Sequence, residues 1–139
     1  MTSVRENDTI TLTGTFKGKE QDKSFSISEG LWYQMMDMCL PAFAASKLDE
    51  ILFYSIGTGN NMGAMSLGEF GAKKVGAEDI TVNGKTYSCT KLSMVLTMFS
   101  WAWTGIYWVD KETGMLVQSG EKKGNKEKVM WQLKKLDFE

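Results

Sequence analysis

The chain has 139 residues, which suits one domain, and its 42% apolar and 24% charged residues are an ordinary globular balance. The net charge of −1 removes the basic face that nucleic-acid binding needs, so no nucleic-acid partner is expected. The absence of histidine excludes His-ligated zinc or copper, Ser-His-Asp and Cys-His nucleophiles, and an imidazole general base.

The N-terminal residues 1–8 are polar and charged, and we expect them to be flexible. They lack the basic start and the apolar stretch of about 7–15 residues that a signal peptide needs. We therefore expect a cytoplasmic protein, or a periplasmic one if a leader has been removed. No apolar run reaches the roughly 18–20 residues of a membrane span, so no span is predicted.

Alternation of apolar and polar residues predicts a first hairpin. In residues 9–17, Ile10, Leu12 and Phe16 fall on one face and the threonines on the other. Such a pattern of period two is typical of a half-buried strand. After a polar turn, residues 23–27 alternate again, so the two runs are expected to pair.

Helical periodicity appears in one stretch. Leu31, Met35 and Met38 recur at helical intervals, which predicts a helix over residues 31–40. Pro41 would interrupt this helix, so we expect an irregular apolar segment after it. Together they are expected to cover one end or face of the sheet.

The rest of the chain predicts a meander of strands and turns. Asn83-Gly84 between β-prone runs is the strongest turn signal, because a type I′ turn needs positive φ at both central residues. A break is expected at residues 71–76, and a turn that closes on glycine at residues 110–114. The remaining strands are expected at residues 50–56, 64–70, 86–99, 101–109, 115–119 and 128–136.

An aromatic segment is the richest candidate for function. Trp101, Trp103 and Tyr107 share one face of the predicted strand, and Trp108 takes the other. A core strand packed on both faces is the simpler interpretation, and a ligand wall is the alternative. Because a buried Trp N–H needs a polar partner, some rings are expected to reach a cavity or the surface.

Other residues give weaker signals. The ten methionines indicate a Met-rich core or, alternatively, an adaptable apolar surface. Carboxylates flank turns and strand ends, where solvated acids are expected, so no catalytic residue is assigned. The Met36-x-Met38 pair without histidine makes a poor copper site, and no metal or cofactor is expected. The lysines of residues 122–128 are interpreted as a solvated hairpin tip.

Cys39 and Cys89 are far apart in the sequence and are flanked by apolar or β-forming residues. We interpret them as buried thiols, because free Cys packs as a small hydrophobe. A disulfide that closes a loop of about fifty residues is the alternative.

Two stretches of the C-terminal half resemble a known group. Residues 80–92 (ITVNGKTYSCTKL) and 105–117 (GIYWVDKETGMLV) show a Gly turn, a strand, a Trp-x-Asp-x-x-Thr-Gly turn and another strand. This order resembles bacterial envelope domains of unknown function, which are similar in outline to the lipoprotein-carrier half-barrels. The strand at residues 49–54 fits as well, so the resemblance covers about residues 28–136. It implies a curved sheet and a covering helix around an apolar cavity, and it supplies no catalytic residues.

The chain thus predicts a single, mainly β domain over residues 1–139: a curved antiparallel sheet or half-barrel of about eight strands with one covering helix. We expect a non-enzymatic protein that binds an apolar or amphipathic molecule, such as a lipid chain, between sheet and helix. The residues expected to line that cavity are Leu31, Met35, Met38, Trp101, Trp103 and Tyr107. A structural or protein-interaction domain with a filled core is the alternative, and the oligomeric state is left open.

Overall fold

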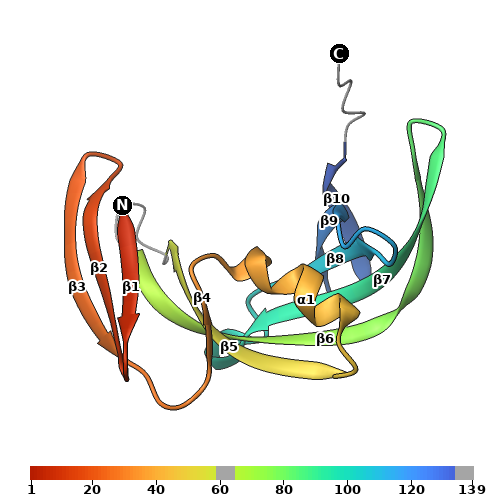
Figure 1. The fold of residues 1–139 in the computed structure, drawn as a ribbon. Helices are drawn as coiled ribbons and strands as arrows, with labels where there is room; N and C mark the ends of the chain where they lie inside the picture. The colour runs from red at the N-terminus through yellow and green to blue at the C-terminus, as the bar shows by residue number, and fades with distance from the viewer. Residues whose placement is uncertain (59–64, 134–139) are drawn as a thin grey trace. The chain divides into compact units, whose positions relative to one another are not determined.

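The computed structural model describes residues 1–58 and 65–133 and is mainly β, as the sequence predicts (Figure 1). The strands are β1 (Thr2–Glu6), β2 (Thr9–Phe16), β3 (Lys19–Ser26), β4 (Leu31–Tyr33), β5 (Glu50–Thr58), β6 (Met65–Val82), β7 (Lys85–Leu96), β8 (Thr104–Asp110), β9 (Leu116–Lys123) and β10 (Lys126–Gln132). The helices are two 3₁₀ turns, η1 (Met36–Cys39) and η2 (Thr97–Phe99), and the α-helix α1 (Leu40–Ala45).

The described strands form two open sheets, where the sequence predicts one sheet of about eight antiparallel strands. One has the order β1-β2-β3, and the other has the order β10-β9-β8-β7-β6-β5-β4. The larger sheet is mixed, because β4 pairs with β5 in parallel, from Leu31 opposite Phe53 to Tyr33 opposite Ser55. The purely antiparallel prediction is wrong here because η1 and α1 supply the long crossover that a parallel pair needs.

The chain divides into two compact units, each with its own cluster of buried side chains. Unit 1 comprises Met1–Met38 and Leu52–Phe70, and unit 2 comprises Cys39–Ile51 and Gly71–Glu139. The cluster of unit 1 contains Ile10, Leu12, Ile27, Ile56 and Met65, and that of unit 2 contains Ile80, Cys89, Ile106, Trp108 and Val117. The single domain expected from the sequence stays a prediction.

The first hairpin of unit 1 is confirmed. β2 pairs antiparallel with β3, and Ile10 and Leu12 are buried in the core of this unit. The N-terminal stretch contains β1, which pairs along β2, and the flexibility expected there stays a prediction. Ladder hydrogen bonds organise this polar segment, and the Arg5 guanidinium adds a bond of 2.7 Å to the carbonyl oxygen of Gly30.

The helix predicted over residues 31–40 is wrong. Its first residues form β4, and the only α-helix of the described residues begins at Leu40 and covers six residues. Pro41 lies in the first turn of α1, where a missing N–H costs nothing, because the first amides of a helix have no partner within it. The proline therefore starts a helix rather than ending one.

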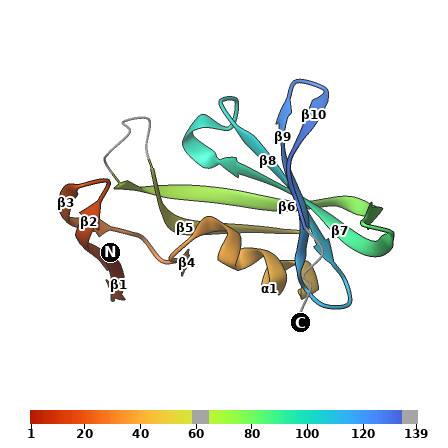
Figure 2. The same cartoon turned by 90° about the horizontal axis from the view of Figure 1, so that it is seen from above.

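Strand alternation in unit 2 separates two faces. Leu92 lies opposite Tyr107 and both are buried, while Ser93 lies opposite Ile106 on the other face. The break predicted at residues 71–76 is wrong, because β6 continues through it with β5 and β7 as neighbours on its two sides. Figure 2 shows β6 as one uninterrupted strand.

The turn after β8 explains the Trp-x-Asp-x-x-Thr-Gly pattern. The Thr113 hydroxyl and amide donate to Asp110 Oδ2 over 2.6 and 3.0 Å, and Gly114, at φ +71°, donates its amide to the Asp110 carbonyl. Burial alone would raise the pKa of the Asp110 carboxyl, but the bonds from Thr113 and from the amide of Glu112 outweigh it and hold that pKa below its ordinary value. The motif is thus a structural turn.

We expect Asp110→Ala to lower the free energy of unfolding by about 1–3 kcal/mol at neutral pH, because it removes a charged acceptor of two hydrogen bonds. Since folding lowers the pKa of this carboxyl, its stabilisation is complete above the ordinary value of 3.8 and is lost as the pH falls through the folded value. Urea denaturation at several pH values should therefore show the variant approaching the parent in acid. Asp79→Ala, at an exposed position of the same unit, is the control.

The Asn83-Gly84 turn is confirmed, with φ of 50° and 78° between β6 and β7. Gly84→Val would force a β-branched residue into this conformation and should cost about 1–3 kcal/mol of stability. Ser88→Val, at an exposed position of β7, is a control without that strain. Equal thermal midpoints for the two variants would contradict the prediction.

Candidate functional site

Unit 2 has an open hollow of about 750 Å³ on the face of the sheet that carries Ser93 and Ile106. This volume lies within the range of small-molecule sites. The residues that line it are Val75, Lys91, Ser93, Ser100, Trp101, Ala102, Thr104, Ile106, Lys122, Lys123, Gly124 and Glu127. They come from strands β6 to β10 and their connections, so the hollow belongs wholly to unit 2.

Two connections form the walls of the hollow. The segment between β7 and β8 contributes Trp101, whose side chain is 85% exposed. The end of β9 contributes Lys122 and Lys123, and the turn that follows contributes Gly124, whose φ of +58° favours glycine. One wall is therefore aromatic and the other is cationic.

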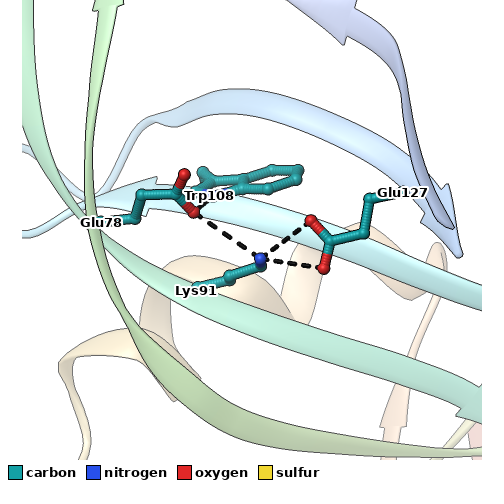
Figure 3. A network of polar contacts seen from close by, with 4 residues as sticks. All are labelled: Glu78, Lys91, Trp108 and Glu127. Carbon is teal, nitrogen blue, oxygen red and sulfur yellow. Dashed lines mark hydrogen bonds and ion pairs between the residues drawn. The ribbon is translucent and has the colours of Figure 1, made fainter. Parts of the chain in front are cut away.

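A polar network lies beside the floor of the hollow (Figure 3). Lys91 Nζ donates to both carboxylate oxygens of Glu127 over 2.9 Å and lies 3.6 Å from Glu78 Oε2. The same ammonium lies 5.1 Å from the ring centroid of Trp108, whose indole N–H donates to Glu78 over 2.9 Å. The Lys91 side chain is only 19% exposed, so these contacts replace most of its water.

The ion pair between Lys91 and Glu127 also indicates how strands β7–β10 are arranged. Cross-strand pairing places Lys91, Trp108, Gln118 and Gln132 in one row across β7 to β10. In a flat sheet this row would span about 14 Å, and Glu127 would lie about 17 Å further along β10. Side chains cannot span that distance, so direct contact means that β7–β10 twist and curl toward this face.

Both carboxylates of the network have partners. Glu127 is paired with Lys91, and Glu78 accepts the bond from Trp108. Among the residues that the structure describes, no group of three acidic or thiol side chains is placed to hold a metal. The hydroxyls of Ser93 and Thr104 and the two wall lysines can receive a polar or anionic group.

The two cysteines are buried thiols outside any disulfide, which confirms the preferred interpretation. Burial raises the pKa of the Cys89 thiol to about 11, and the carboxylates of Asp110, Asp79 and Glu78 act in the same direction. At neutral pH this thiol is protonated and a poor nucleophile.

The six residues predicted to line one cavity divide between the units. Leu31 in β4, Met35 before η1 and Met38 in η1 belong to unit 1 and are exposed. The other three, Trp101, Trp103 and Tyr107, belong to unit 2. A cavity lined by all six stays a prediction.

Within unit 2, the three predicted aromatic residues have different positions. Trp101 lies in the turn before β8 rather than in a strand, and it lines the hollow. Trp103 and Tyr107 pack against Gly105 instead. A Cβ atom placed on Gly105 would lie 2.7 Å from the Trp103 ring and 2.8 Å from the Tyr107 ring, so both rings cover this glycine. Only Trp101 of the predicted set therefore reaches the candidate site.

The sequence analysis missed Lys91. It predicted the wall lysines as part of a solvated hairpin tip, and both are exposed there, but it did not connect them with a binding site. A signal for Lys91 existed, because it lies in an alternating strand on the same side as Cys89, which is buried. A lysine at such a position requires a carboxylate partner. Nothing in the local sequence pattern predicts that Glu127 is that partner.

Comparison with known protein families, curated proteins and solved structures finds no match for this chain. The resemblance to bacterial envelope domains therefore stays a prediction. None of the helices in the described ranges has the length and apolar character needed to cross a membrane.

A double-mutant cycle tests the network. Lys91→Met should lower the free energy of unfolding by about 1 kcal/mol, because it leaves the Glu127 and Glu78 carboxylates, which are 37% and 49% exposed, without their cation. Glu127→Gln should show a clear coupling energy with it in urea denaturation. The control is the exposed pair Lys73–Glu50, whose atoms lie 3.1 Å apart and whose coupling should be much smaller. Equal coupling in the two cycles would contradict a structural role for Lys91.

Proposed function

We propose that the hollow of unit 2 binds an amphipathic anion with an apolar chain, such as a fatty acid, without chemical change. The observation that carries this proposal is that an exposed tryptophan and two lysines line the same hollow of about 750 Å³. Trp101 offers apolar surface to the chain, while Lys122 and Lys123 offer charge to the acidic group. This extends the expectation of an apolar or amphipathic ligand from the sequence.

The energetics of the hollow support this ligand class. Apolar surface removed from water contributes about 25 cal/mol for each Å², and Trp101 has most of its ring to bury. The curl of β7–β10 supports a concave binding face of the kind that the curved-sheet prediction requires. Because Glu127 is occupied by Lys91, its repulsion of an anionic group is reduced.

A protein-interaction domain is the second candidate. β10 lies at one end of the strand order and exposes three large apolar side chains, those of Val129, Met130 and Trp131. An edge strand of this kind can add a strand from a partner. The irregular pairing between Val129 and Trp131 weakens this candidate, because a bulge disrupts edge pairing.

A fluorescent fatty-acid analogue tests the leading proposal. Its emission should change saturably with the full chain, and Trp101→Ala should weaken binding by about tenfold or more, since a large apolar contact is lost. Trp131→Ala removes a tryptophan outside the hollow and should leave binding unchanged.

The head-group part of the proposal has its own test. Lys122→Gln combined with Lys123→Gln should weaken binding of the carboxylate analogue but not of the matching alcohol. No saturable binding to the parent chain, or equal effects of Trp101→Ala and Trp131→Ala, would refute the proposal.

A further inference from the structure

The connection between β7 and β8 exposes three large apolar side chains in succession. Met98 is 81% exposed, Phe99 is 47% exposed and Trp101 is 85% exposed. The rings of Phe99 and Trp101 meet edge to face, with centroids 6.4 Å apart, so they pack on each other outside the core. We call Met98, Phe99 and Trp101 the apolar tip.

Positive charge lies on the same side of unit 2 as this apolar tip. Lys122 and Lys123 line the same hollow as Trp101, and Figure 2 shows the β7–β8 connection and the β9–β10 hairpin turned to the same side. Residues 121–128 contain four lysines and two glutamates. One of these glutamates, Glu127, is already bound to Lys91, so the excess charge at the hairpin is positive.

We propose that the apolar tip and the two adjacent lysines dock this protein onto an anionic lipid surface. Tryptophan suits the membrane–water interface because its ring is largely apolar and carries one polar N–H. Met98 and Phe99 would enter the boundary between head groups and acyl chains, and Lys122 and Lys123 would contact lipid phosphates. This surface interaction goes beyond the ligand of the hollow.

Charge complementarity favours a bilayer as the occupant of this surface. A membrane accepts an apolar group surrounded by lysines without demanding a fitted shape, and each lysine near an anionic surface contributes about fivefold in affinity. The tip is formed by a 3₁₀ segment and the turn that follows it rather than by a strand edge or a long helix, so it presents side chains rather than backbone.

The test is flotation of the full chain with vesicles of equimolar phosphatidylcholine and phosphatidylserine. The protein should float with these vesicles, bind phosphatidylcholine alone about 25-fold more weakly, and be released by salt. Met98→Ser should weaken binding by about tenfold, because it removes an inserting side chain. Met130→Ser changes an exposed methionine of β10 instead and should bind like the parent.

Charge is tested separately. The pair Lys122→Gln and Lys123→Gln should weaken binding by about 25-fold. The pair Lys17→Gln and Lys19→Gln makes the same change in net charge in unit 1 and should have little effect. Equal losses for the two pairs would overturn the inference, because general attraction would then explain binding.

These outcomes are separable from those of the proposed function. Met98 does not line the hollow, so Met98→Ser should bind the fluorescent analogue normally in the absence of vesicles. Analogue binding without vesicle binding would overturn this inference alone. Dimerisation of the parent chain that Met98→Ser abolishes would also overturn it, because a second copy would then cover the tip.

Discussion

One partly buried ammonium group organises unit 2. Lys91 Nζ contacts carboxylates from β6 and β10 and the face of a tryptophan from β8, so a single cation joins four strands (Figure 3). A lysine that has lost most of its water needs such partners, because an unpaired charge in a protein interior is strongly unfavourable. Glu127, the second residue of β10, lies opposite Lys122 in β9, so the same ion pair helps to fix the position of the cationic wall of the hollow.

Two tryptophans from one short segment, Trp101 and Trp108, have opposite environments in unit 2. Trp108 is buried, and its indole N–H is satisfied by Glu78. Trp101 is exposed beside the hollow, where its indole N–H can donate a hydrogen bond to water. The expectation that some rings would reach the surface is met by Trp101, and the packed-core interpretation applies to Trp108. Burial of Trp108 and exposure of Trp101 are the basis of both proposals.

Features that depend only on residues close together in the sequence could be predicted from it. Alternation located β2 and the faces of β7, and the Asn83-Gly84 pair located a turn, because positive φ is a local requirement. The helical spacing of Leu31, Met35 and Met38 gave a wrong prediction. A helical pattern over ten residues can also occur in a segment that pairs with a neighbouring strand, as β4 does with β5. Local preference is weaker than pairing with a formed strand.

By itself, the sequence determined the β class, the first hairpin, the Asp110–Thr113 turn pattern and the absence of imidazole chemistry. Only the tertiary structure decided the parallel pairing of β4, the meeting of Lys91 with Glu127 and the placement of Trp101 and Lys122 in one hollow. The physical reason is that Lys91 and Glu127 are 36 positions apart and meet through the curl of the strands. That curl is the sum of twists across several strand pairs, and no local pattern of residues encodes it.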